Sequence, residues 1–578
     1  MRVIVRKGIL ACVAAAMGLQ GWSEDGLDMA VPPEAAAAPA PVAAKRDVVS
    51  VRLPGAAFAA MQTVNPERIR WHVRYLSHDL LEGRGTGQRG GDIAAEYIAT
   101  QFAEYGLRPA GDNGSYLQKV PLVGVTTLAE TQFALVPKRL APIVLKPLDE
   151  YVAHDRTQQA QSEVDADIVY VGYGIEAPEY DWDDYKGVDV RGKVLLMLVN
   201  EPPSDDPKFF KGKALTYYGR WTYKFEEATR RGAAGVILVH REDMASYPWS
   251  VVRNSFSGEQ SYLKLEGPAL QVASWVQLDV ARKLAAAADM DLEKLMADAR
   301  TREFHPVNLG VKLKAHMVSN VRNFASNNVL AMLPGSDRNL KDEAVIYTAH
   351  YDHFGIRPDM PAGNNIFHGA ADNATGCGIL LELARAFSVA RERPARSVIF
   401  AAVTAEEQGL LGSEYLGKHP PVPAGKIALD LNYDDVKPLG SPEEVEVTGA
   451  ERTTFYPWVQ ATAKEFRLAI RPDARPEAGH FYRSDHFSLA RVGIPSFSIN
   501  EGMKFQGHDE AWGLAQEKEF VEKHYHQPSD EYHPEMDFVG DAAMARFGFA
   551  LGWEAASLTR LIGWQKGDEF ESARVKSQ

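Results

Sequence analysis

Apolar residues recur along the chain in two rhythms, and each rhythm predicts a different secondary structure. Between residues 65 and 111, Ala95, Ile98, Phe102 and Leu107 recur at near-helical spacing, which predicts two helices around a Gly-rich turn. The turn lacks the G-x-x-x-x-G-K-[ST] spacing of a phosphate loop, and no apolar strand leads into it. We therefore interpret it as a tight turn.

The second rhythm consists of short apolar runs bounded by turn residues. From about residue 149 to 318 these runs are rich in β-branched residues and predict a β-rich module with a few helices. Beyond residue 328, four apolar strands alternate with helical stretches, which predicts an α/β sheet with its loops at the strand ends. The four strands are AVIYTAHYDH, RSVIFAAVTAEE, KIALDLNYDDV and GIPSFSIN.

The N-terminus has the pattern of a Sec-type signal peptide, with basic residues before an apolar run from Gly8 to Leu19. That run is shorter than the ~20 residues needed to cross a bilayer, and no later segment is long and apolar enough. We therefore expect an exported protein, periplasmic or secreted, with no membrane span. Because Cys12 lies in the signal, Cys377 is the one cysteine of the mature chain, which excludes an intramolecular disulfide.

Composition narrows the choice of partners. A chain of 578 residues predicts two or more domains, and residues 30–45, rich in Ala and Pro, predict a tether without a core. The 77 acidic residues outnumber 63 basic ones, which gives a formal net charge of −14. Nucleic acids and anionic membranes are therefore unfavourable partners.

Polar residues that can do chemistry cluster at the ends of the predicted strands. On a strand, His350 and Asp352 face the same side, so Asp352 is predicted to hydrogen-bond and orient the His350 imidazole. His353 faces elsewhere and is not expected to be a ligand. On this segment alone, an ordinary surface His–Asp pair remains an alternative.

Three further carboxylates follow the same pattern. Asp372 precedes an amphipathic helix, where it is either an N-cap or a carboxylate that bridges two cations. Glu406 and Glu407 stand together at a strand end, where their mutual repulsion suggests nearby cations. One of them can bind metal while the other acts as a base, although acidic residues are also common at helix starts.

The last two segments complete a set of ligands. Among Asp430, Asp434 and Asp435, Asp434 lies at the strand end and is the best candidate. In KHYHQPSDEYH, nothing local separates His524 from His526 as a ligand. Two imidazoles and three carboxylates, with a spare carboxylate, suit two zinc ions in mixed N/O coordination.

Taken in order, these segments resemble the di-zinc exopeptidases that include bacterial leucyl aminopeptidases, aminopeptidase Y and glutamate carboxypeptidase II. The motifs of that family are H-x-D, D-x-x-[ST]-G, E-E, N-x-D and H-x-x-x-D. Here they stand as His350-Tyr-Asp352, Asp372-Asn-Ala-Thr375-Gly376, Glu406-Glu407, Asn432-Tyr-Asp434 and His526-Gln-Pro-Ser-Asp530.

The resemblance implies a role for each residue. It assigns His350 and Asp434 to one zinc ion, Glu407 and His526 to the other, and Asp372 to a bridging position. It makes Glu406 the general base that takes a proton from a metal-activated water, and it makes Asp352 a residue that supports His350 without binding metal. Tyr525 or Tyr482 is implied as a hydrogen-bond donor to the oxyanion. Asp485 and His486 receive no role, and Asp435 stands where the family often has Met.

The resemblance also implies a domain organisation. A zinc-exopeptidase fold, a mixed central sheet flanked by helices, is interrupted by a β-rich insert that resembles a protease-associated (PA) domain. The predicted ranges are 1–22 signal peptide, 23–60 Ala/Pro-rich linker, 61–148 first part of the peptidase domain, 149–318 PA insert, 319–565 catalytic domain and 566–578 polar tail.

The predicted activity is that of an exported zinc aminopeptidase acting on peptides with a free N-terminus. The nearest alternative is a carboxypeptidase, which needs arginines around its pocket. Near a motif, Arg483 is the one obvious candidate. Glutaminyl cyclases share the sheet but hold one zinc and lack the insert, and a receptor-like binding protein would have lost ligands that are intact here.

Overall fold

The folded part of the chain begins before residue 61. The computed structural model describes residues 49, 51–245, 248–357, 360–361 and 363–578, so the predicted signal peptide and most of the predicted linker lie outside the described residues. The end of that linker forms helix α1 (Gly55–Met61), which buries Ala57, Ala60 and Met61. Contact with the core therefore starts within the range predicted as a linker.

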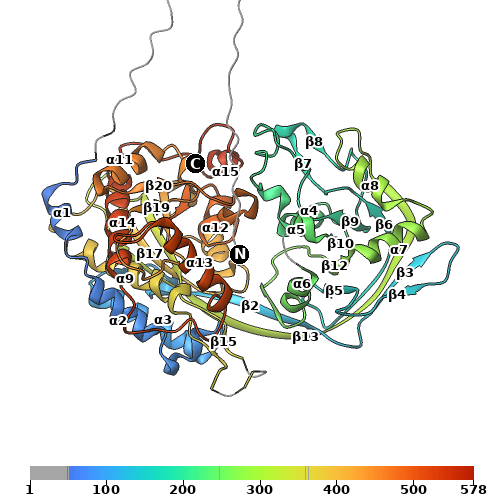
Figure 1. Cartoon of the computed structure of the whole chain (residues 1–578), viewed down its shortest axis with the longest axis horizontal. Coiled ribbons are helices and arrows are strands. Elements are labelled where there is room, and N and C mark those ends of the chain that lie inside the picture. Colours follow the sequence, from blue (N-terminus) through green and yellow to red (C-terminus); the bar gives the residue numbers. More distant parts are fainter. Residues whose placement is uncertain (1–48, 50, 246–247, 358–359, 362) are drawn as a thin grey trace, which may run out of the picture. The chain divides into compact units, whose positions relative to one another are not determined.

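A mixed sheet forms the centre of the peptidase part (Figure 1), as the sequence predicted. β21, β18, β14 and β17 run parallel to one another, whereas β13 pairs antiparallel with β17. The strands in spatial order are β21 (Ser496–Ser498), β18 (Ile427–Asn432), β14 (Ala344–His350), β17 (Ser397–Val403) and the last part of β13 (Val307–Leu333).

Helices cover both faces of this sheet because alternate strand residues point to opposite sides. Val345, Tyr347 and Ala349 of β14 belong to one core cluster, while Ala344 and Ile346 belong to another. The first cluster includes residues of α2 (Pro66–Leu76), α3 (Arg89–Glu104), α9 (Thr375–Ser388), α11 (Tyr456–Phe466) and α14 (Val539–Ser557). The second includes residues of α10 (Leu411–Lys418) and α12 (His486–Arg491).

Local sequence explains where α2 begins. The Asn65 side chain accepts a hydrogen bond from the Glu67 N–H at 2.8 Å, and Pro66 stands at the first helical position. The α2 helix buries Ile69, Val73 and Leu76. The two predicted helices around the Gly-rich turn are therefore present as α2 and α3.

The predicted insert contains its own sheet with a core on each face. Strands β6, β9, β10 and β12 are parallel, and β5 closes the edge antiparallel to β12. Helices α7 and α8 pack on one face, and α4 and α6 pack on the other. The bounds are β5 (Tyr151–His154), β6 (Gln161–Tyr170), β9 (Val194–Leu198), β10 (Gly235–His240), β12 (Val272–Gln277), α4 (Trp221–Arg230), α6 (Trp249–Ser255), α7 (Leu278–Ala287) and α8 (Leu292–Asp298).

One long strand joins the two parts. β13 pairs with β6 in the insert and with β3 (Gln132–Pro137), which precedes the insert in the sequence. It also pairs with β2 (Leu117–Thr127) along its middle and with β17 in the peptidase sheet. The boundary predicted between residues 318 and 319 falls inside this continuous strand. Its polar middle, NVRNFASNN, resembles a linker in sequence, but it pairs with β2 along its whole length.

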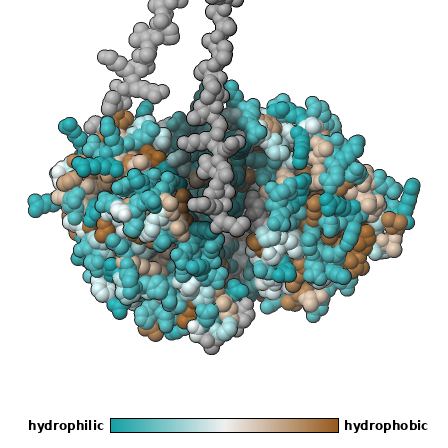
Figure 2. Space-filling view, in the orientation of Figure 1, coloured by the Kyte–Doolittle hydropathy of each residue, from teal (hydrophilic) through white to brown (hydrophobic). Residues whose placement is uncertain are grey.

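The chain end is also folded. Helix α15 (Glu571–Ser577) occupies most of the predicted polar tail, and the buried Arg574 guanidinium donates to the carbonyls of Ala424, Ile427 and Ile562. Among the described residues no helix is both long and apolar enough to cross a membrane. Hydrophilic side chains dominate the face in Figure 2, and apolar ones are scattered over it.

Candidate metal and catalytic site

Three strand ends bring the predicted site residues to one edge of the sheet. β14 ends at His350, β17 ends three residues before Glu406, and β18 ends two residues before Asp434. Because these strands are parallel neighbours, their carboxyl ends meet at the same edge. Asp372 lies in the irregular turn before α9, and His526 follows helix α13 (Glu510–Lys523).

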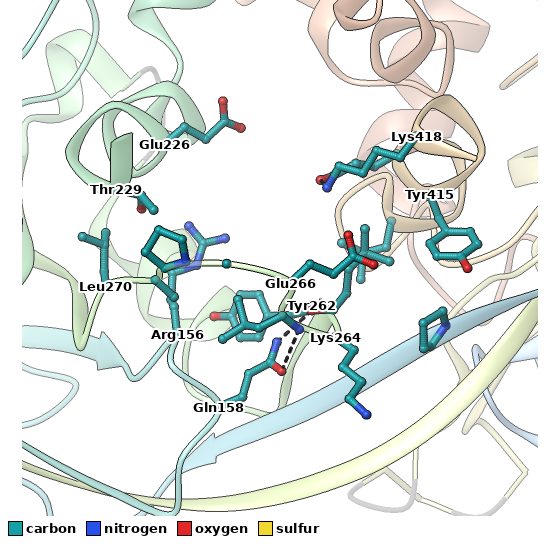
Figure 3. Close-up of a pocket in the computed structure, with 18 of the residues that line it drawn as sticks. Arg156, Gln158, Glu226, Thr229, Tyr262, Lys264, Glu266, Leu270, Tyr415 and Lys418 are labelled. Atoms are coloured by element: carbon teal, nitrogen blue, oxygen red, sulfur yellow. Dashed lines mark hydrogen bonds and ion pairs between the residues drawn. The ribbon is translucent and has the colours of Figure 1, made fainter. Parts of the chain in front are cut away.

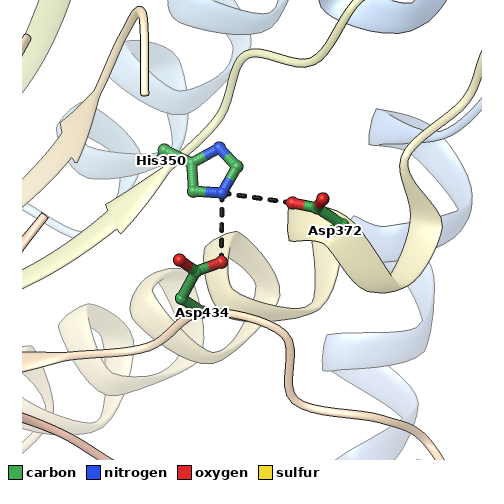
Figure 4. Close-up of side chains that lie close together, drawn as sticks. All are labelled: His350, Asp372 and Asp434. Carbon is green, nitrogen blue, oxygen red and sulfur yellow. Dashed lines mark hydrogen bonds and ion pairs between the residues drawn. The ribbon is translucent and has the colours of Figure 1, made fainter. Parts of the chain in front are cut away.

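The first group consists of His350, Asp434 and Asp372 (Figure 4). The His350 Nε2 atom lies 3.1 Å from Asp434 Oδ1 and 3.3 Å from Asp372 Oδ1. One donor atom from each residue lies within 4.8 Å of the others, close enough for one cation to reach all three. His350 and Asp372 are buried, while Asp434 is partly exposed.

A second group uses the other oxygen of Asp372. The His526 Nε2 atom lies 3.2 Å from Asp372 Oδ2 and 3.4 Å from Glu407 Oε2. Asp372 therefore presents Oδ1 to His350 and Oδ2 to His526, which is the arrangement that a bridging carboxylate requires. His524 is turned away, since its Nδ1 lies 3.1 Å from the Ser529 carbonyl oxygen and 3.1 Å from the Ser529 hydroxyl oxygen.

His353 joins this second group, so the prediction that it faces elsewhere is wrong. Its Nδ1 contacts the Glu407 carboxylate, and it shares a candidate cation group with Asp372 and Glu407. The prediction failed because β14 ends at His350, and the alternation of a strand does not continue to residue 353. The sequence signal was present, since HYDHFG places a second imidazole three residues after the first.

Asp352 supports His350 in a different way from the one predicted. The His350 Nδ1 atom lies 3.1 Å from the Asp352 backbone carbonyl oxygen but 3.8 Å from its carboxylate. That carboxylate accepts hydrogen bonds from the Glu406 N–H at 3.1 Å and the Thr86 hydroxyl at 2.8 Å. Asp352 therefore orients His350 through its main chain and holds the glutamate turn through its side chain.

The adjacent glutamates have different surroundings. Glu407 contacts both His353 and His526, whereas the Glu406 carboxylate forms no hydrogen bond with any residue that the structure describes. Both line a cavity of about 350 Å³ that also reaches Tyr525 and His526. The geometry fits a ligand role for Glu407 and a base role for Glu406, and both roles remain predictions.

The electrostatics of the cluster favour bound cations. Burial raises the pKa values of Glu406 and Glu407 well above the ordinary range, and neighbouring carboxylates add to the effect. Burial alone would lower the pKa of His350, but Asp434, Glu406 and Asp372 raise it well above its usual value. Hydrogen bonds from His350 and His526 hold the pKa of Asp372 well below its ordinary value, although its burial acts in the opposite direction. A buried group of this composition stabilises positive charge, and its N and O donors are those that zinc binds.

Two residues outside the predicted site hold the Asp372 turn. The Asp530 carboxylate accepts hydrogen bonds from the N–H groups of Ala371 at 2.9 Å and Asp372 at 3.1 Å. The fully buried Arg84 guanidinium donates to the carbonyls of Tyr351 at 2.7 Å and Gly369 at 2.8 Å. Two more of its hydrogen bonds reach the carbonyls of Leu76 and His368, both at 2.6 Å.

Ser484 is a further residue that the sequence analysis missed. Its hydroxyl donates to Asp434 Oδ2 at 2.6 Å and accepts from Asn432 Nδ2 at 2.8 Å. It thereby fixes the Asp434 oxygen that does not face His350. The neighbouring Asp485 is buried, and burial raises its pKa to about 7.

The residues predicted to meet the substrate divide into two groups. Tyr525 stacks on the His526 ring with centroids 3.8 Å apart and keeps 38% of its surface exposed. It lines the cavity that Glu406 and Glu407 also line, which we call the metal cavity. Arg483 lines the same cavity. Tyr482 also borders it, but its hydroxyl donates to Glu569 at 2.7 Å and is therefore less suited to an oxyanion.

Comparison with known proteins confirms the family resemblance. The sequence profile of Peptidase family M28 matches residues 328–545, a segment that contains every predicted ligand and Glu406. The chain is 28% identical over 224 residues to aminopeptidase YwaD of Bacillus subtilis, covering 38% of this chain and 42% of that protein. It is 30% identical over 173 residues to the BOS complex subunit NCLN of Canis lupus familiaris, covering 28% of this chain and 29% of that protein.

These relatives are matched over less than half of their length. Among solved structures, an aminopeptidase from Aneurinibacillus sp. strain AM-1 aligns with 87% of this chain and 97% of its own, at 18% identity and a TM-score of 0.48.

Proposed function

We propose that the Peptidase family M28 segment at residues 328–545 makes this protein a zinc aminopeptidase that removes N-terminal residues from peptides. The observation that carries the proposal is the position of Asp372, whose two oxygens face His350 and His526 separately. Two zinc ions would be held by His350 and Asp434 on one side, by Glu407 and His526 on the other, and by Asp372 between them.

Bound zinc would supply Lewis acidity that polarises the scissile carbonyl and makes a water molecule a stronger nucleophile at neutral pH. Glu406, whose carboxylate has no hydrogen-bond partner among the described residues, accepts the proton of that water and delivers it to the leaving amine. Glu407 keeps its place through His353, and Asp434 keeps its place through Ser484. Tyr525, beside His526, is placed to donate a hydrogen bond to the oxyanion.

A carboxypeptidase is the second candidate, and one observation favours it. Arg156 and Arg483 both line the cavity that contains Glu406, and the Arg156 guanidinium lies over the rings of Phe225 and Tyr262 rather than in an ion pair with a described carboxylate. Arg483 is predicted from the sequence because it lies near a motif, whereas Arg156 belongs to the insert and lies far from any motif. Guanidinium groups at this position can bind the C-terminal carboxylate of a substrate.

Substrate blocking separates the two activities. An aminopeptidase is expected to hydrolyse leucyl and alanyl amides and to leave their N-acetylated forms intact, because the cavity carboxylates hold the free ammonium group. Release of C-terminal residues, or equal turnover of blocked and free substrates, would favour the carboxypeptidase instead. We also propose that the protein is exported, on the strength of its signal-like N-terminal sequence.

A further inference from the structure

A second cavity adjoins the one that contains Glu406. The metal cavity has a volume of about 350 Å³, and the second has about 650 Å³ (Figure 3). The first is near the lower end of the ~300–1,000 Å³ typical of small-ligand sites, so it has little room for a longer chain. The two cavities share the wall residues Arg156, Glu226, Tyr262, Leu411, Glu414 and Arg491.

An edge strand runs along both cavities. β11 (Gln260–Leu263) pairs with β2 and with no other strand of the part that the structure describes. Gln260 and Ser261 line the metal cavity, Leu263 lines the second cavity, and Tyr262 lines both. The strand therefore leads from the metal site into the larger space.

Among the described residues, the Gln158 side chain bonds to the main chain at the outer edge of β11. The Lys264 N–H donates to the Pro121 carbonyl of β2, so by strand alternation Ser261 and Leu263 direct their main-chain groups away from β2. Gln158 donates to the Leu263 carbonyl at 2.8 Å and accepts from the Leu265 N–H at 3.2 Å (Figure 3). The Gln158 side-chain amide forms the same two hydrogen bonds that a peptide group would form, so the main chain of a bound peptide can take its place. Such an edge is where an extended peptide can add as a strand.

The walls of the second cavity carry charges of both signs. Lys418 pairs with Glu414 at 2.6 Å, and Arg491 pairs with Glu226 at 2.9 Å. The Arg156 guanidinium lies over the rings of Phe225 and Tyr262, 5.6 and 5.1 Å from their centroids. This mixture of charged groups and ring faces suits a peptide with varied side chains better than an apolar ligand.

We propose that the second cavity binds the downstream residues of extended peptide substrates, whose main chain pairs with the outer edge of β11 in place of the Gln158 amide. The inference rests on the proposed aminopeptidase function and adds that longer peptides are the preferred substrates. Each main-chain hydrogen bond gained should improve kcat/KM roughly 2- to 10-fold, chiefly through KM.

The test is a length series of leucyl substrates assayed with zinc-loaded full-length protein. We expect kcat/KM to rise by about 10-fold or more from the dipeptide to the pentapeptide. N-methylation of the third-residue amide should remove part of that gain. A flat length series, or no effect of N-methylation, would overturn the inference. Leucyl amide, which does not reach the second cavity, tests the aminopeptidase function separately.

A matched pair of variants tests the location. Ala269 is half-buried and lines the second cavity, whereas Ala286 is exposed on α7 and lines neither cavity. Ala269→Trp should abolish most of the length dependence while leucyl amide turnover stays unchanged, and Ala286→Trp should change neither. If Ala269→Trp left the pentapeptide advantage intact, the downstream residues would lie elsewhere. If the wild-type protein did not hydrolyse leucyl amide, the proposed aminopeptidase function would be rejected instead.

Discussion

Glu406 and Glu407 are adjacent in sequence but have different surroundings in the site. Glu407 is held between His353 and His526, while Glu406 borders the same cavity with its carboxylate free of described partners. The Glu406 N–H donates to Asp352, which also provides the carbonyl oxygen near His350. The turn after β17 thus directs two identical side chains to different tasks.

Substitution by glutamine should separate these tasks. Glu406→Gln keeps the size of the side chain but removes its basicity, so zinc content should remain near that of the wild type. Activity should fall by about 10²- to 10⁴-fold, as is typical when a general base is lost. Glu407→Gln should weaken one metal site, and added zinc should restore part of the rate.

Metal analysis beside kinetics checks this prediction. A metal-depleted Glu406→Gln protein together with a metal-replete Glu407→Gln protein would reverse the two assignments.

At this scale the sequence predicted residue types better than side-chain directions. Motif spacing predicts five ligands, and the structure brings all five together. They are His350, Asp372, Glu407, Asp434 and His526. The directions of Asp352 and His353 were inferred from strand alternation, which stops where β14 stops. The sequence does not indicate the role of Ser484, because a hydroxyl that supports a metal ligand has no characteristic local pattern.

At the level of elements, the site depends on how loops are tied together. The Arg84 guanidinium connects the end of α2, the loop after β14 and the turn before Asp372 through four carbonyl groups. Local sequence patterns do not predict tertiary hydrogen bonds of this kind. Here they predicted only a tight turn. The same limit explains β13, whose pairing with β2 shows only in three dimensions.

Arg84→Lys should therefore destabilise the fold and loosen the metal site. An ammonium group cannot reach four carbonyls that a planar guanidinium spans, so buried acceptors lose their donors. We expect the free energy of unfolding to fall by about 2–4 kcal/mol. Denaturant unfolding measures this loss, and competition with a chelator measures the affinity for zinc. Arg74→Lys, an exposed change on the preceding helix α2, is the control. Equal stability of both variants would remove Arg84 from this role.

Helix α2 also carries a pH-sensitive residue. Burial lowers the pKa of His72 from 6.5 to about 4, and the positive charges of Arg68 and Arg385 contribute. The unfolded chain takes up this proton below about pH 6.5, whereas the folded chain does so only near pH 4. Stability is therefore complete above pH 6.5 and is lost as the pH falls towards 4.

His72→Gln should reduce that acid sensitivity by about 2 kcal/mol at about pH 4.5. Urea unfolding of the variant and the wild type at pH 7 and 4.5 gives the difference. The exposed His508→Gln serves as the control. An identical pH dependence in wild type and His72→Gln would show that this imidazole is not the acid-sensitive group.

For the whole molecule, the sequence predicts the fold class but not how the insert and the peptidase part contact each other. Strand and helix rhythm predicted a mixed sheet flanked by helices, and the structure has that sheet. The insert, however, borders the metal cavity through Arg156, Trp221 and Tyr262. No local feature of the sequence indicates that a segment about 200 residues before Glu406 forms a wall of its cavity. The wall of the metal cavity is therefore built by both parts together.

The proposed aminopeptidase site requires two zinc ions that share Asp372. Titration of metal-free protein with zinc, with bound metal and hydrolysis of leucyl amide followed together, tests this requirement. We expect activity to saturate at two zinc ions per chain, and Asp372→Ala to lose high-affinity binding of both ions together. Full activity at one zinc ion per chain, or an Asp372→Ala variant that retains both ions, would contradict it.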